Sequence, residues 1–130
     1  MTYLLRRISI ILLLVALGAV AVADDTKGEV RVILIFNQTT GPMMLNKIQA
    51  DIGVGGDNAE TWVRGATAKK ELPPDTYSIV AKKAEVCSFG NCVPCPDQKQ
   101  DVDVKPAGKS DVVFRWKAHY DRVEKKWVCE

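Results

Sequence analysis

Residues 72–81, Leu-Pro-Pro-Asp-Thr-Tyr-Ser-Ile-Val-Ala, join a tight turn to an alternating run. Proline has a fixed φ and no N–H to donate, so Pro73 and Pro74 are expected to end one element and turn the chain into the next. After the turn, Tyr77 and Ile79 share one face of a predicted strand. A tyrosine at this place can bury its ring and donate its hydroxyl back to the turn, as the tyrosine corner of Greek-key sandwiches does. The stretch therefore predicts a β-sandwich.

The rest of the chain repeats this pattern of short alternating or apolar runs between turn-forming residues. Such a pattern, with no convincing helical period after the first 23 residues, predicts an all-β, seven- to eight-stranded Greek-key sandwich of immunoglobulin-like type. The strands are expected at residues 30–36, 44–52, 61–65, 101–104, 111–116 and 123–129 and, within 72–81, after the Pro-Pro-Asp turn, with a polar approach at 69–71 and a bend at 119–122.

The first 23 residues have the three parts of a secretory signal peptide: a basic start, an apolar run and a small-x-small site. Arg6 and Arg7 precede the apolar run 8–22, and Ala21-Val22-Ala23 stands ahead of two aspartates. The apolar run is shorter than the ~20 residues that span a bilayer comfortably. Cleavage is therefore favoured over retention as an anchor, and the mature protein is expected to be secreted or periplasmic with no stable membrane span.

The mature chain, residues 24–130, is long enough for a single domain with a modest core. Removal of Arg6 and Arg7 from the 18 Lys and Arg leaves 16, against 16 Asp and Glu. A neutral chain with no basic patch among aromatic residues argues against a nucleic-acid partner. Asn37 begins an Asn-x-Thr sequon, which matters only if the source secretes through a eukaryotic pathway.

Three segments resemble carboxypeptidase regulatory-like (transthyretin-like) domains. The run 30–50, with its Thr-Gly-Pro-Met turn, is similar to their first hairpin, and 72–77 resembles their Leu-Pro-Pro-Gly-Thr-Tyr turn, with Asp75 in place of Gly. Residues 102–114 resemble their closing hairpin, so the similarity covers about residues 29–116. The family's Asp-x-x-Gly-x-Phe segment is not recognisable before the turn. The resemblance implies a non-catalytic seven-stranded sandwich, often an accessory or adhesion module on exported proteins.

Four cysteines are the most chemically suggestive residues. Cys87, Cys92 and Cys95 lie in one loop, 86–97, and Cys129 stands one residue from the end. An exported chain with an even number of cysteines favours two disulfides, each worth ~2–4 kcal/mol. One bridge inside the loop and one that ties the C-terminal strand to it is the favoured arrangement, but spacing does not determine which cysteines pair.

Other chemistries of the four cysteines remain open at this stage. The C-x4-C-x2-C…C spacing matches plant-type ferredoxins, and four thiolates would also suit tetrahedral zinc. Val93 and Pro94 stand where small residues usually let amides reach cluster sulfurs. Cys92-Val93-Pro94-Cys95 is also similar to the redox pair of thioredoxin-type proteins, but Pro96 and the absence of a βαβ pattern argue against the helix which that chemistry needs. A thiol that pairs with another protein is a fourth reading.

Catalysis is not predicted, and no cofactor is expected. His119 is the only histidine, and no serine stands in a nucleophile elbow. Function is expected instead on loops held by a rigid scaffold, with an unknown protein or carbohydrate of the cell envelope as the partner. The predicted C-terminal hairpin extension, 117–130, adjoins the cysteine loop in this scheme. A structural alternative makes Trp116 and Trp127 cross-strand neighbours of the closing hairpin. The candidate binding surface consists of Phe89, Asn91, Trp116, Tyr120 and Trp127.

Overall fold

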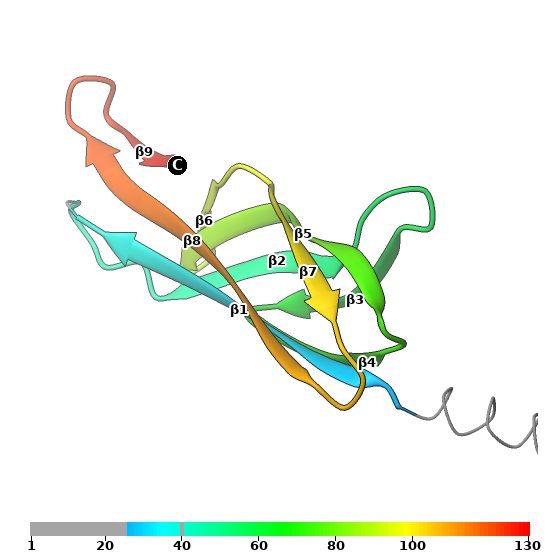
Figure 1. The fold of residues 1–130 in the computed structure, drawn as a ribbon. Helices are drawn as coiled ribbons and strands as arrows, with labels where there is room; N and C mark the ends of the chain where they lie inside the picture. The colour runs from blue at the N-terminus through cyan, green and yellow to red at the C-terminus, as the bar shows by residue number, and fades with distance from the viewer. Residues whose placement is uncertain (1–25, 40) are drawn as a thin grey trace, which may run out of the picture.

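The computed structural model describes residues 26–39 and 41–130, so the predicted signal peptide at 1–23 lies outside the described residues. This part of the chain is all-β and contains nine strands and no helix (Figure 1). None of its segments is therefore a helix long and apolar enough to cross a membrane. The strands are β1 (Gly28–Gln38), β2 (Lys47–Val54), β3 (Glu60–Gly65), β4 (Thr67–Leu72), β5 (Asp75–Ser88), β6 (Asn91–Pro94), β7 (Gln98–Val104), β8 (Lys109–Asp121) and β9 (Lys126–Cys129).

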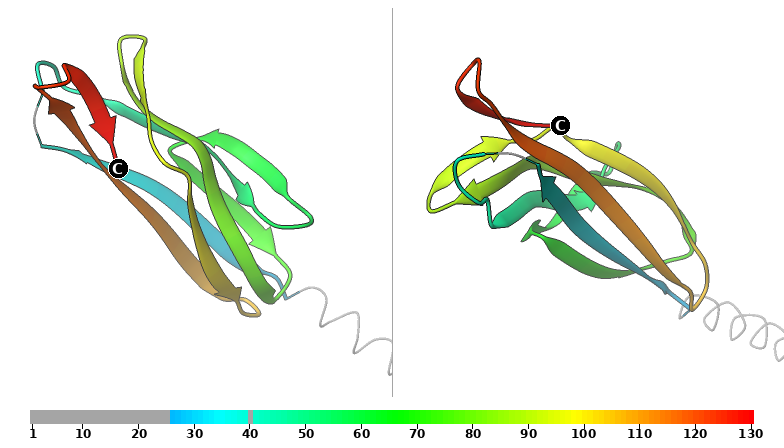
Figure 2. Two further views of the ribbon diagram at one scale, coloured as in Figure 1. Left: turned by 90° about the horizontal axis from the view of Figure 1, so that it is seen from above. Right: turned by 90° about the vertical axis from the view of Figure 1, so that its left-hand side faces the viewer.

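The strands form two sheets that face each other (Figures 1 and 2). One sheet has the order β4-β1-β8-β9, and its central pair β1 and β8 is parallel. The other has the order β3-β2-β5-β6, with β7 also paired to β5. The 14-residue strand β5 is long enough to pair with β7 along its first half and with β6 along its second half. The molecule is therefore β-sandwich-like.

Alternating side chains from both sheets fill the space between them. Val30, Val32 and Leu34 of β1 are buried, as strict alternation requires for one inward face. Phe114 and Trp116 of β8 extend the same layer, and both are 1 % exposed. The facing sheet supplies its own buried alternate residues, which include Ile48, Ala50, Ile52, Ile79, Ala81 and Val86.

Side-chain amides close one side of the sandwich. Gln98 and Gln100 of β7 donate their Nε2 groups to the carbonyl oxygens of Arg115 and Val113 of β8, at 2.7 and 3.2 Å. These bonds give partners to two backbone carbonyl groups on the edge of β8 that β9 leaves uncovered, because β9 pairs only with the end of β8. On the opposite side, the chain passes directly from β3 of one sheet to β4 of the other.

The Pro-Pro turn has the predicted tyrosine bond. Tyr77 is half-buried, and its hydroxyl donates to the carbonyl of Pro73 at 2.7 Å. Burial, and after it the charge of Asp75, raises the pKa of the Tyr77 hydroxyl. The neutral phenol that this bond requires is therefore favoured in the folded protein.

Several predicted boundaries were wrong. Lys69 and Lys70, expected in a polar approach, lie in β4 and pair with β1; they read as polar because β4 is an edge strand, where lysine is common. Met44 precedes β2, which begins at Lys47. His119 lies in β8, and the bend follows at 122–125, so the last strand is shorter than expected. The added strands β4 and β6 bring the number to nine.

Candidate functional site

Three separate turns lie at the same end of the sandwich. The pair Gln38–Ala118 places the end of β1 beside the last part of β8, and the pair Lys47–Cys87 places the start of β2 beside the end of β5. The side chain of Gln38 accepts a hydrogen bond from the N–H of Leu45, just before β2, and so brings these two ends of the sheets to the same level. Figure 2 shows the turns that follow these strands at one end, and the start of β1 at the other. We call this region the loop end and define it as residues 41–46, 88–91 and 122–125.

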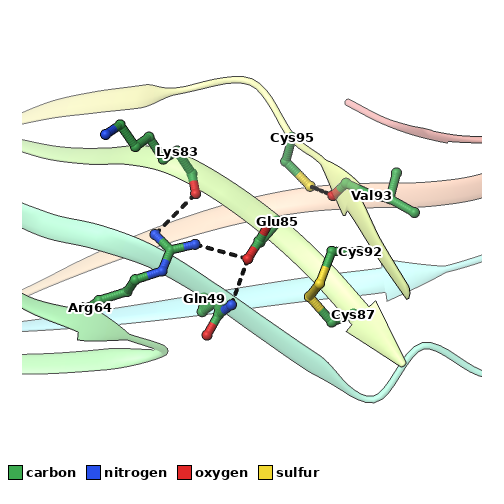
Figure 3. Close-up of a disulfide and its surroundings, with 8 residues drawn as sticks. All are labelled: Gln49, Arg64, Lys83, Glu85, Cys87, Cys92, Val93 and Cys95. Atoms are coloured by element: carbon green, nitrogen blue, oxygen red, sulfur yellow. Dashed lines mark hydrogen bonds and ion pairs between the residues drawn. A yellow bond between two sulfur atoms is a disulfide. The ribbon is translucent and has the colours of Figure 1, made fainter. Parts of the chain in front are cut away.

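The first disulfide closes the β5–β6 hairpin. Cys87 and Cys92 are directly opposite in the antiparallel pair and are bonded to each other. Only Ser88 to Asn91 lie between them, so the bond staples the turn just behind its tip (Figure 3). Cys87 is buried and Cys92 is exposed, so the staple reaches from the core to the surface of the loop end.

The second disulfide attaches the last strand to the same region. Cys95, just after β6, is bonded to Cys129 at the end of β9, 34 residues later. The predicted arrangement of one bridge inside the loop and one to the C-terminal strand is thus the one observed. No free cysteine occurs in the described residues. In this state none of the four sulfurs is a thiolate that could hold a metal or attack a disulfide.

One acidic side chain lies beside the first disulfide, but it is already engaged. Glu85 comes within 4.8 Å of the sulfurs of Cys87 and Cys92. Its carboxylate accepts a hydrogen bond from Gln49 at 2.6 Å and pairs with Arg64 at 2.9 Å (Figure 3). The bond to Asp51 is the main cause that raises the pKa of Arg64; burial opposes it, and the bond to Glu85 adds to the rise. The group therefore links β2, β3 and β5 and supports the base of the hairpin.

Phe89 is the most exposed large apolar side chain of the described chain. It is 92 % exposed and has a φ of 49° in the two-residue turn that it forms with Gly90, whose φ is 85°. A bulky residue is uncommon in this left-handed region, where asparagine and glycine are favoured. Asn91 is exposed and pairs with Ser88 next to the turn. The hairpin therefore presents an aromatic ring to solvent in a conformation that costs free energy.

Trp116 does not belong to the candidate surface. It is 1 % exposed, and its Nε1 donates to the carbonyl of Pro96 at 2.8 Å. The reason is strand parity: Phe114, Trp116 and Ala118 all point to the inner face of β8. It is also not the cross-strand partner of Trp127, because Tyr120 is.

Tyr120 and Trp127 form an aromatic pair on the β8–β9 hairpin. Their ring centroids are 5.5 Å apart in an edge-to-face arrangement, and both residues are half-buried. A side chain at Gly41 would overlap the indole of Trp127. Trp127 therefore packs against the loop between β1 and β2 and supports the loop end more than it forms an open stacking platform.

The other two turns of the loop end also carry exposed apolar side chains, Met44 at 41–46 and Val123 at 122–125. Neither residue was predicted from the sequence to belong to a binding surface. Met44 is 74 % exposed and Val123 is 88 % exposed. Met44 was expected to start a strand, and Val123 was expected inside one. Their sequence neighbours could have indicated exposed turns, because Met44 shortly follows Gly-Pro and Val123 stands among charged residues.

Comparisons with protein-family models, with curated proteins and with solved structures found no match to this chain. The geometry of the described residues therefore carries the functional argument.

Proposed function

We propose that this protein is an exported, non-catalytic β-sandwich module that has a binding or structural role at the cell envelope or outside the cell. The observation that carries this proposal is the pairing of all four cysteines in two disulfides, Cys87–Cys92 and Cys95–Cys129. Structural disulfides persist in oxidising compartments such as the periplasm and the extracellular space. A signal peptide at 1–23 would bring the chain there.

The finer class we propose is a Greek-key sandwich of the immunoglobulin-like, carboxypeptidase regulatory-like kind. The bond from Tyr77 to Pro73 supports it, since a tyrosine that donates back to its turn is characteristic of such sandwiches. Two sheets that enclose one core support it as well. The partner of the proposed module would be a protein or a carbohydrate at the cell envelope.

Expression of the full chain in a bacterium with a periplasm, followed by intact-mass measurement, tests the proposal. We expect a periplasmic protein that lacks residues 1–23 and is lighter by four hydrogens than its reduced form, because two disulfides are present. It should take up no alkylating reagent before reduction and contain no stoichiometric metal. The matched control is the Cys87→Ser, Cys92→Ser protein, which keeps one disulfide. Its oxidised form should be lighter than its reduced form by two hydrogens in place of four.

Alkylatable thiols together with stoichiometric iron or zinc would contradict the proposal. That result would favour the alternative, a small metal-binding or thiol-redox protein that uses the same four cysteines. Retention in the cytoplasm with an intact N-terminus would contradict the proposed export.

A further inference from the structure

We propose that the loop end docks on an anionic lipid bilayer, with Met44, Phe89 and Val123 as three apolar side chains that insert into its surface. Five large hydrophobic side chains are exposed in the described chain, and four of them lie on the loop end; the fifth, Val63, is on β3. Scattered exposed apolar residues need no explanation, but their concentration at one end does. This inference goes beyond the proposed function and does not require a protein or carbohydrate partner.

Met44 stands on a loop that is braced on both sides. The side chain of Gln38 donates to the carbonyl of Met43 at 2.7 Å and accepts from the N–H of Leu45 at 2.7 Å. Leu45 is only 4 % exposed and packs into the core. Gln38 and Leu45 thus fix the backbone around Met44, and the thioether side chain is left in solvent.

Val123 stands on a turn that is braced in a different way. One carboxylate oxygen of Asp121 accepts the N–H groups of Val123 and Glu124, at 2.9 and 3.1 Å. Lys125 completes the turn with a φ of 55°. The turn is short and internally bonded, so the isopropyl group of Val123 is held at its tip.

Phe89 is the third braced side chain, because the Cys87–Cys92 bond closes its hairpin directly behind the turn. Each of the three turns therefore presents an apolar group on backbone that is already ordered, and the first turn adds the less exposed Met43 beside Met44. Ordered groups lose little conformational freedom when they are transferred to a new environment, which favours binding. Three unrelated braces around three exposed apolar tips are the observation that carries this inference.

The charge around these tips suits anionic headgroups. The turns and the strand residues next to them carry five cationic side chains, Lys47, Lys117, Arg122, Lys125 and Lys126, all of them exposed. The same region has four acidic side chains, Asp121, Glu124, Glu130 and Glu85, and the carboxylate of Glu85 is already paired with Arg64. The Asp121 carboxylate also binds backbone within its own turn. Clusters of Lys and Arg beside apolar groups attract anionic membrane surfaces.

A bilayer fits this arrangement better than a protein pocket does. The two views of Figure 2 show the three turns apart from one another: the β5–β6 turn stands away from the other two in the left view, and the β8–β9 turn does so in the right view. A protein interface usually buries one contiguous apolar core. Separate tips, each flanked by polar or charged residues, can instead enter a fluid interface independently, because lipids rearrange around each one.

Co-sedimentation of the oxidised mature protein with lipid vesicles tests the inference. We expect binding to vesicles of phosphatidylcholine with about 30 % phosphatidylglycerol, much weaker binding to pure phosphatidylcholine, and a loss as salt rises from roughly 0.1 to roughly 0.5 M. The triple variant Met44→Gln, Phe89→Asn, Val123→Ser should bind at least about tenfold more weakly. Asparagine suits the left-handed backbone of residue 89, so the hairpin is expected to remain folded.

The control variant is Val63→Ser, which removes the exposed apolar side chain of β3 and should change vesicle binding by less than about twofold. Unchanged urea midpoints for the triple variant would show that its fold is intact. Absence of binding to the anionic vesicles at millimolar lipid would overturn the inference, as would equal binding by the triple variant and the wild type. Self-association in the ultracentrifuge that the triple variant abolishes, without any vesicle binding, would also overturn it in favour of a protein contact. None of these outcomes depends on the mass measurement that tests the proposed function.

Discussion

The indole N–H of Trp116 donates a hydrogen bond to the carbonyl oxygen of Pro96, at 2.8 Å. Trp116 belongs to β8 of one sheet, whereas Pro96 follows Cys95 beyond β6 of the other. The bond thus ties the core to the segment that carries the second disulfide. The tryptophan stabilises the loop end from within and does not contact a partner itself.

Truncation of Trp116 is therefore expected to lower stability. Trp116→Ala should reduce the free energy of unfolding by about 3–5 kcal/mol, because it leaves a cavity in the core and removes the bond to Pro96. Trp116→Phe should cost less, since most of the packing is retained. Urea unfolding measures both, with the half-buried Trp127→Phe as the control. A loss below about 1 kcal/mol for Trp116→Ala would mean that the indole is not a core residue.

Tyr77→Phe isolates the turn bond. The variant keeps the ring but removes the hydroxyl that donates to Pro73, so we expect a loss of about 0.5–1.5 kcal/mol in the free energy of unfolding. Because the pKa of Tyr77 is raised on folding, the stabilisation linked to its titration is present below the ordinary tyrosine pKa and is lost as pH rises through the higher folded value. The phenylalanine variant should lack this alkaline loss in denaturation measured against pH. An equal alkaline loss in both proteins would assign it to another group.

The two disulfides should contribute unequally. Cross-linking stabilises more when it closes a longer loop, and the sequence separations are 34 for Cys95–Cys129 and 5 for Cys87–Cys92. Chain-entropy arguments give roughly 4 and roughly 2 kcal/mol respectively. The double variants Cys95→Ser, Cys129→Ser and Cys87→Ser, Cys92→Ser should show this order in urea denaturation. The reverse order would indicate that the hairpin staple supports more of the fold than its loop length implies.

The ion pair between Arg31 and Asp111 gives a prediction for acid pH. Arg31 donates two hydrogen bonds to this carboxylate, at 3.1 and 2.9 Å, and these bonds, followed by its charge, lower the pKa of Asp111. A carboxyl whose pKa falls on folding stabilises the protein above its ordinary pKa of about 3.9, and this contribution is lost as pH falls through the lower folded value. Arg31→Gln should return the pKa of Asp111 toward its ordinary value in an NMR titration of the carboxyl carbon. Arg115→Gln removes a cation from β8, the strand of Asp111, and should leave the pKa of Asp111 unchanged.

Local patterns were sufficient for much of the fold. Alternation at β1 and around Ile79 predicted strands correctly, because burial of one face imposes a period of two on the residues themselves. The Pro-Pro turn and its tyrosine were equally local. The polar strand β4 was missed for the opposite reason: an exposed edge places little constraint on side chains, and only its pairing with β1 shows that it is a strand.

The sequence by itself indicated an all-β domain after residue 23, the Tyr77 turn and two disulfides, and it favoured one bridge within the cysteine loop and one to the last strand without fixing which cysteines pair. Tertiary structure alone decided which exposed residues share a surface. Trp116 and Phe89 are both aromatic residues near the cysteines, yet one is 1 % and the other 92 % exposed. Met44 and Val123, 79 positions apart, lie at the same end because β1 and β8 pair in parallel. Exposure and proximity depend on strand register and on the facing sheet, which no local window of residues contains.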